Sequence, residues 1–176
     1  MARVLCIANQ KGGVGKTTTA INLAVGLAKA GCKTLLVDLD PQCNATSGLG
    51  QSPLDSHPLV NCAPLRQGVV RIRNSALEML PGTRSLRDVE ALVRGDQGHA
   101  DRLRELLCGG LNGYDFVLID CPPSLGQLTR TALLASNEVV MPIQCEYFAM
   151  EGLVHMIEVI RDVMHQGPNR LQFGGI

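Results

Sequence analysis

The sequence contains few aromatic side chains and no excess of either charge. Tryptophan is absent, and aromatic residues make up 3% of the 176 positions. So few rings argue against a surface on which the bases of single-stranded nucleic acid stack, although they say nothing about duplex DNA held through its phosphates. The 16 basic residues balance the 16 acidic ones, whereas strong nucleic-acid binders usually carry a basic excess.

The sequence also lacks long apolar runs and paired-cysteine motifs. No stretch is long enough to span a bilayer, and the N-terminal apolar run over 4–8 is too short for a secretory signal. The seven cysteines include no Cys-x-x-Cys pair. Their spacing gives little support to an iron–sulfur or zinc site and favours buried free thiols in a reducing cytosol. We therefore expect a soluble, cytoplasmic protein without a membrane segment.

What the sequence does contain is an alternation of short apolar runs and amphipathic segments. This alternation predicts an α/β fold, in which a mostly parallel sheet carries helices on both faces. The polar stretch 41–68 predicts a long loop or an irregular helical region. The expected strands are 3–9, 33–40, 76–80, 115–120, 138–143 and the start of 171–176, and the expected helices are 17–30, 85–94, 100–108, 125–136 and 150–165.

A glycine-rich loop joins the first expected strand to the first helix. It departs from the general P-loop pattern Gly-x-x-x-x-Gly-Lys-[Ser/Thr], because Gln10 stands in place of the first Gly. Glycines let backbone N–H groups surround an anion, and the helix N-terminus adds partial positive charge. A plain glycine turn is the alternative, but the flanking strand and helix favour a phosphate loop. We predict that ATP with Mg²⁺ binds on Lys11, Gly12, Gly13, Val14, Gly15, Lys16, Thr17 and Thr18.

Three aspartates end two of the expected buried strands. Asp120 follows Phe-Val-Leu-Ile and stands where a Walker B carboxylate holds Mg²⁺ through water, with a strand-end cap as the alternative. Asp38 and Asp40 share one face of their strand because they are two residues apart. One can orient the attacking water and the other can support the Mg²⁺ shell. An Asp-Pro turn at Asp40 is a compatible alternative.

Four ordered motifs resemble one family. They are Lys-Gly-Gly-Val-Gly-Lys-Thr-Thr (11–18), Val-Asp-Leu-Asp-Pro-Gln-x-Asn-Ala-Thr (37–46), Leu-Ile-Asp-Cys-Pro-Pro-Ser (118–124) and Met-Pro-Ile-Gln-Cys-Glu-Tyr-Phe-Ala-Met-Glu-Gly-Leu (141–153). Together they closely resemble the ParA/Soj chromosome- and plasmid-partitioning ATPases. These belong to the deviant Walker A class of P-loop NTPases, with MinD and the nitrogenase iron protein. The resemblance covers residues 2 to about 165 and is weakest over 51–75.

The resemblance implies a role for each site residue. Lys11 would cross an ATP-bound dimer to the partner's phosphates and act like an arginine finger supplied in trans. Lys16 would bind phosphate in cis, Thr17 would ligate Mg²⁺ and Asp40 would position the hydrolytic water. Asp120 would be the Walker B carboxylate, and segments 42–50 and 122–128 would form two switches ordered by the γ-phosphate. Two departures from the family pattern are Cys43, where relatives usually carry Gly, and Thr131, where an Asn is common.

The resemblance also implies partners and a longer protein. ATP would drive dimerisation and nonspecific DNA binding on the nucleoid, and a ParB-like partner would stimulate hydrolysis. Family members continue well past residue 176, so we expect 1–176 to be a single P-loop ATPase domain that lacks its C-terminal part. Much of the basic DNA-binding surface and the base-recognising loop belong to that later part.

Four further readings stay open at the level of sequence. A MinD-like membrane-cycling regulator would need a C-terminal amphipathic helix. An electron-transfer reductase would need cysteines that bridge a cluster, and Cys121 lacks the expected Cys-Gly-Gly context. A truncated module without hydrolysis is disfavoured by the intact lysines and aspartates. GTP could replace ATP, although no Asn-Lys-x-Asp motif occurs.

Overall fold

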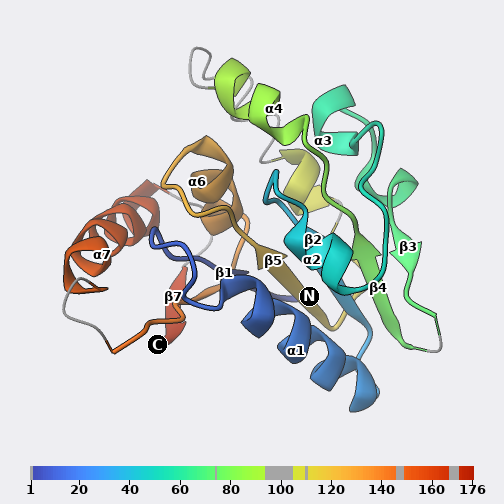
Figure 1. The fold of residues 1–176 in the computed structure, drawn as a ribbon, viewed down its shortest axis with the longest axis horizontal. Helices are drawn as coiled ribbons and strands as arrows, with labels where there is room; N and C mark the ends of the chain where they lie inside the picture. The colour runs from blue at the N-terminus through green and yellow to red at the C-terminus, as the bar shows by residue number, and fades with distance from the viewer. Residues whose placement is uncertain (1, 74, 94–104, 110, 146–148, 167–170) are drawn as a thin grey trace.

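A computed structural model describes residues 2–73, 75–93, 105–109, 111–145, 149–166 and 171–176. Within these residues, seven strands form one sheet in the order β3-β4-β2-β5-β1-β6-β7 (Figure 1). Every neighbouring pair is parallel except β3 with β4. The strands are β1 (Arg3–Ile7), β2 (Thr34–Asp38), β3 (Val70–Arg71), β4 (Leu77–Leu80), β5 (Phe116–Asp120), β6 (Glu138–Val140) and β7 (Gln172–Gly175).

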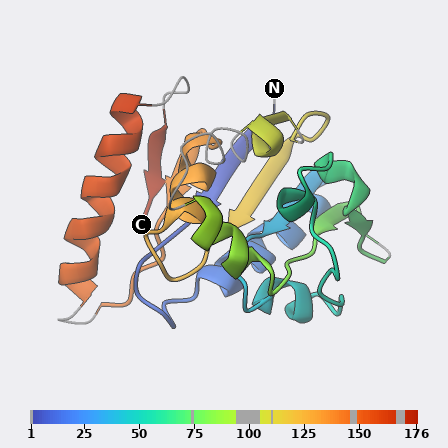
Figure 2. The same ribbon diagram turned by 90° about the horizontal axis from the view of Figure 1, so that it is seen from above.

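Helices cover both faces of this sheet (Figure 2). They are α1 (Lys16–Lys29), α2 (Asn44–Gly48), α3 (Pro58–Asn61), α4 (Leu86–Val93), α6 (Gln127–Leu134) and α7 (Ala149–Gln166), with a 3₁₀ turn η1 (Leu65–Gln67); residues 105–109 are also helical. The sheet has an apolar core on each face, and alternate residues of β2 belong to different cores. Leu36 packs with α1, whereas Leu35 and Val37 pack with α4 and α6. The predicted α/β class, with helices on both faces of a mostly parallel sheet, is confirmed.

Small residues let α1 lie close to the sheet. Ala20, Ala24 and Ala28 are buried and four residues apart, so they form one stripe on the helix. They pack with Ile7, Leu36 and Leu118 from the three central strands. This packing fixes the beginning of α1, and therefore the glycine loop, above the carboxyl ends of these strands.

Several predicted boundaries are corrected by the structure. The expected strands 3–9 and 138–143 end earlier, at Ile7 and Val140, because the following residues turn toward each other. The Asn9 side-chain amide donates to the carbonyl of Pro142 at 2.8 Å, and Pro142 itself has no N–H for a ladder. The antiparallel β3 was missed because two residues are too few for a periodicity. Residues 100–104 of the expected helix 100–108 lie outside the described residues.

The region 41–68 contains the short helices α2 and α3 and the 3₁₀ turn η1, in agreement with the predicted irregular helical region.

The cysteine prediction is right in one respect and wrong in another. None of the seven cysteines, all of which lie in the described residues, forms a disulfide, but Cys62, Cys108 and Cys145 are exposed because they lie in loops and at a helix end rather than in apolar strands. Cys6 in β1 and Cys121, which directly follows β5, are buried with their sulfurs 3.3 Å apart.

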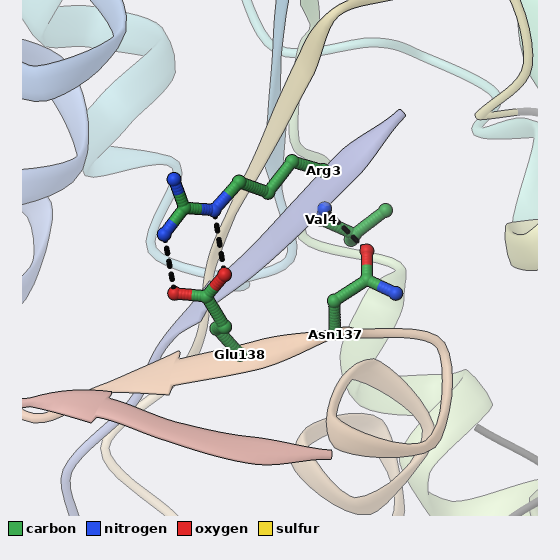
Figure 3. Close-up of polar contacts among 4 residues, drawn as sticks. All are labelled: Arg3, Val4, Asn137 and Glu138. Carbon is green, nitrogen blue, oxygen red and sulfur yellow. Dashed lines mark hydrogen bonds and ion pairs between the residues drawn. The ribbon is translucent and has the colours of Figure 1, made fainter. Parts of the chain in front are cut away.

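Polar contacts tie β1 to the β6 side of the sheet (Figure 3). The Arg3 guanidinium donates to both carboxylate oxygens of Glu138, at 2.5 and 2.8 Å, and the Val4 amide donates to Asn137 Oδ1 at 2.8 Å.

The predicted last strand is present as β7, which pairs parallel with β6 at the sheet edge. No helix among the described residues is both long enough and apolar enough to cross a membrane.

Candidate nucleotide site

The predicted site residues converge at the carboxyl edge of the three central strands. The loop 11–18 follows β1, Asp120 ends β5, and Asp38 ends β2, and these strands are neighbours in the order β2-β5-β1. The register pairs Asp38 with Asp120, and Asp120 with Ile7. Two carboxylates and the glycine loop therefore stand side by side, at the edge where parallel α/β sheets bind ligands.

The glycine loop depends on glycine at two positions. Gly13 and Gly15 have φ values of 76° and 90°, which side-chain-bearing residues rarely adopt. Two residues that the sequence analysis missed support the loop from outside. Asn9 Oδ1 accepts from the Lys11 amide at 3.0 Å, and Gln144 Nε2 donates to the Gly13 carbonyl at 3.1 Å. Neither residue belongs to a P-loop pattern, so only the fold reveals their function.

Lys16 is the central cation of the site. It is the first residue of α1 and only 7% exposed, and its Nζ donates to the Lys11 carbonyl at 2.9 Å. Burial lowers the pKa of its ammonium, and the negative charges of Asp120 and Asp40 oppose this change. The lysine is thus held in the loop before any phosphate arrives.

Asp120 is a fully buried carboxylate near the Thr17 hydroxyl. It is 0% exposed, and among the described residues neither carboxylate oxygen has a hydrogen-bond partner of ordinary distance and angle, although Thr17 lies near enough to affect its pKa. Burial raises the pKa of this carboxyl to about 7; the Thr17 hydroxyl and the Lys16 charge oppose the rise, and Asp38 and Asp40 add to it. The carboxylate oxygens of Asp120 and the nearby Thr17 hydroxyl are the oxygen ligands that a hard cation such as Mg²⁺ prefers, and a bound cation would favour the ionised carboxylate. The residues present therefore fit the predicted metal.

The raised pKa of Asp120 predicts a pH-dependent stability. The folded protein keeps a proton that the unfolded chain, with an ordinary carboxyl pKa near 3.8, releases. In the absence of nucleotide, the free energy of unfolding should therefore fall on the order of 3 kcal/mol between about pH 4 and pH 7. Urea unfolding at several pH values measures this. Asp120→Asn should remove most of this decrease in the free energy of unfolding. The remaining decrease is due to Asp38, because burial raises the pKa of that carboxyl as well.

The exposed Asp88 provides the control for this measurement. Asp88→Asn should retain the full pH dependence because its carboxyl lies in water. Equal pH dependence in wild-type protein and in Asp120→Asn would contradict the assignment of a proton-holding carboxyl to Asp120.

Asp38 accepts hydrogen bonds from three donors in this structure. Its Oδ2 accepts from Thr46 Oγ1 at 2.6 Å and from the Thr46 amide at 2.9 Å, and its Oδ1 accepts from the Asp40 amide at 3.1 Å. Thr46 Oγ1 in turn accepts from the Gly82 amide at 2.8 Å. Asp38 therefore joins the end of β2 to α2 and to the segment after β4. The metal role predicted for Asp38 remains a prediction.

Asp40 begins the predicted turn and faces the loop. Its Oδ1 accepts from the Gln42 amide at 2.8 Å, and its carbonyl accepts from the Cys43 amide at 2.8 Å. The Asp-Pro turn is thus present together with a carboxylate at the site. Cys43 takes the left-handed φ of 56°, a conformation that favours the Gly expected in relatives. Thr131 is buried in α6.

A hollow of about 460 Å³ lies over the loop. Of the predicted residues, Lys11, Val14, Asp38 and Asp120 do not belong to the wall of the hollow, and the two aspartates are fully buried. Ile21 is a lining residue that sequence reasoning missed. The wall is formed by Gly12, Gly13, Gly15, Lys16, Thr17, Thr18, Ile21, Asp40, Gln42, Asn44 and Pro123, so both expected switches contribute.

The fold and this loop define the class of α/β P-loop nucleotide-binding proteins. A family model described as an AAA domain matches residues 2–173. The chain is 45% identical over 174 residues to the chromosome partitioning protein ParA of Myxococcus xanthus, covering 96% of this chain and 61% of that protein. It is 41% identical over 181 residues to the sporulation initiation inhibitor protein Soj of Bacillus subtilis, covering 100% of this chain and 72% of that protein.

Solved structures show the same likeness. Cobyrinic acid a,c-diamide synthase from Mycobacterium smegmatis, with a bound ATP analogue and magnesium, superimposes with a TM-score of 0.90 at 37% identity, covering 100% of this chain and 74% of that one. The chain belongs to the ParA/Soj family of partitioning ATPases. The chain spans 61% of the length of the Myxococcus relative.

Proposed function

We propose that this chain binds ATP with Mg²⁺ on the loop 11–18 and hydrolyses it as a switch in chromosome or plasmid partitioning. The observation that carries the proposal is Asp120, a fully buried carboxylate near Thr17 and Lys16 whose oxygens have no hydrogen-bond partner of ordinary distance and angle among the described residues. Burying an ionised carboxylate is energetically unfavourable unless a cation binds its oxygens. The nucleotide and magnesium bound by the Mycobacterium structure support this reading.

In the proposed site the phosphates lie on the loop. Gly12, Gly13 and Gly15 line the hollow, where their amides would bind phosphate oxygens, and Lys16 supplies the positive charge. Thr17 and Asp120 would hold Mg²⁺, with Asp38 behind them, and Thr18 would bond a further phosphate oxygen. When bound, Mg²⁺ neutralises the charge on the phosphate oxygens.

Asp40 and Lys11 would act on the hydrolytic step. The Asp40 carboxylate lines the hollow, where it can accept a proton of the attacking water and orient it. Lys11 does not line the hollow of its own chain, which suits a side chain that reaches the phosphates of a second copy. An ATP-dependent homodimer follows, in which each protomer's loop completes the other site.

The named relatives support the biological setting. The name of the Myxococcus relative, a chromosome partitioning protein, supports a partitioning role. Within that role we propose a cytoplasmic, nucleoid-associated protein that binds DNA nonspecifically and has a ParB-like activating partner. The MinD-like alternative has no observation in its favour among the described residues. The electron-transfer reading would need a cluster bridged by cysteines, and Cys121 is buried against Cys6.

Replacing Asp40 tests the hydrolytic step. Asp40→Ala should lower ATP turnover at least ~100-fold, the usual scale for a positioned base, while ATP binding and the dimer persist. Steady-state phosphate release and light scattering with ATP measure both. Asp40→Asn keeps an acceptor for the Gln42 amide but removes the charge, so it should be equally inactive if the charge is what matters.

The exposed Asp55 offers a matched control. Asp55→Ala should turn over ATP at the wild-type rate. Normal turnover in Asp40→Ala would overturn the assigned role, and failure of the wild-type chain to bind ATP would overturn the proposed function itself.

A further inference from the structure

A second hollow, of about 340 Å³, lies at the opposite end of the sheet from the nucleotide site. Its wall includes Lys33, which precedes β2, and Tyr114, which precedes β5. The amino ends of parallel strands share one edge, and five-residue strands are about 15 Å long. The hollow is therefore separate from the loop 11–18 and from Asp120.

Three cations surround this hollow, and one more is adjacent. Lys33, Arg66 and Arg71 line it together with a single carboxylate, that of Glu78. A neighbouring hollow shares Arg71 and adds Arg73. All four cations are exposed. Arg71 and Ala76 line both hollows, and the β3–β4 edge that carries Arg71 lies at the right of Figure 1. In a chain whose charges balance overall, this edge is a local concentration of positive charge.

The nearby carboxylates are engaged by neutral donors. Glu78 stands opposite Arg71 in the β3–β4 register, yet its Oε2 accepts from the Tyr114 hydroxyl at 2.6 Å. Asp115 accepts from the Lys33 backbone amide at 2.8 Å. Within the described residues, none of the four cations forms an ion pair. Their charges are thus available to a ligand.

Arg66 is held in place although it is exposed. Its Nη2 donates to the Asn112 carbonyl at 2.9 Å, and its guanidinium carbon lies 5.8 Å from the centre of the Tyr114 ring. Gly113 makes room for it, because a Cβ there would lie 2.9 Å from Nη2. A free surface arginine samples many rotamers, whereas this one is restrained by a hydrogen bond and a ring contact. A guanidinium that is already ordered, and whose remaining N–H groups are available, loses less conformational entropy when it binds an anion with two acceptor oxygens.

We propose that this hollow, walled by Lys33, Arg66 and Arg71, binds a phosphate group of a second anionic ligand. Guanidinium forks and ammonium groups together match the oxygens and the charge of phosphate. The three lining cations exceed the single carboxylate by two charges, which a phosphate dianion balances. The phosphate belongs either to a free phosphorylated compound or to a nucleic-acid backbone, and the experiment separates these sources.

The test uses inorganic pyrophosphate as the probe and Lys16→Ala as the background, because that change removes the main phosphate contact of the loop 11–18. Calorimetric titration at low salt should show that the Lys16→Ala chain still binds pyrophosphate. Adding Arg66→Gln should weaken this binding at least tenfold. Arg161→Gln makes the same charge change on the exposed face of α7, at the other side of the molecule, and should have no effect.

Arg71→Gln provides a second variant should Arg66→Gln alter the fold, because Arg71 is exposed on the short edge strand β3; it should also weaken binding. Displacement of pyrophosphate by a short DNA duplex would support the proposed phosphate site and identify the nucleic-acid backbone as the source of the phosphate. Lack of displacement would support it with a free phosphorylated compound. Absence of pyrophosphate binding to the Lys16→Ala chain, or equal loss in the Arg66 and Arg161 variants, would overturn the proposal.

Discussion

Lys16→Ala is expected to weaken the binding of ATP with Mg²⁺ at least ~100-fold, about 2.7 kcal/mol. The lysine is the buried cation of the loop, and its ammonium is already placed by the Lys11 carbonyl at 2.9 Å. Its removal takes away the main positive charge for the phosphates. It also leaves Asp120 without the ammonium that lowers its pKa. Calorimetric titration of the nucleotide measures the loss.

Lys29 is the matched control for this substitution. It lies in the last turn of the same helix α1 and is exposed. Lys29→Ala changes the net charge equally, but it should leave nucleotide affinity unchanged because its ammonium is in water at the far end of the helix. An unaltered affinity in Lys16→Ala would refute phosphate binding on this loop.

Lys11→Ala is expected to spare nucleotide binding, which Lys16→Ala weakens, and to abolish dimerisation instead. Nucleotide binding by the single chain should persist, since both backbone bonds of Lys11 survive the change: its amide donates to Asn9 and its carbonyl accepts from Lys16. ATP-dependent dimerisation should be lost. Turnover should fall on the order of 10³-fold, the scale of a cation supplied in trans. Light scattering and phosphate release, with Lys29→Ala as control, measure these effects. Intact dimerisation would contradict the trans role.

The main features of the fold and the site could be predicted from sequence because they depend on local patterns. Buried strands such as β2 and β5 are nearly continuous apolar runs, and Asp120 is recognisable because it ends one of them. The rule that parallel strands share their carboxyl edge then brings Asp38, Asp120 and the glycine loop together.

The contacts that support the site could not be predicted in this way. Asn9 and Gln144 hold the loop from two segments 135 positions apart, and Thr46 binds Asp38 from across a turn. Hydrogen bonds between distant side chains leave no periodicity in the sequence. The missed β3 is too short to show one. The basic hollow around Arg66 could not be predicted either, because its three cations come from a loop, a 3₁₀ turn and an edge strand.

Mixing two inactive variants tests the central claim, a dimeric ATP switch with Lys11 acting in trans, most directly. Lys11→Ala and Asp40→Ala chains should each hydrolyse ATP poorly alone. In a mixed dimer, the Lys11→Ala protomer keeps its own Asp40 and receives Lys11 from its partner, so one site is complete. The account predicts that phosphate release recovers on mixing. Mixed dimers that form, as shown by co-purification of differently tagged chains, but hydrolyse no faster than the separate variants would contradict it.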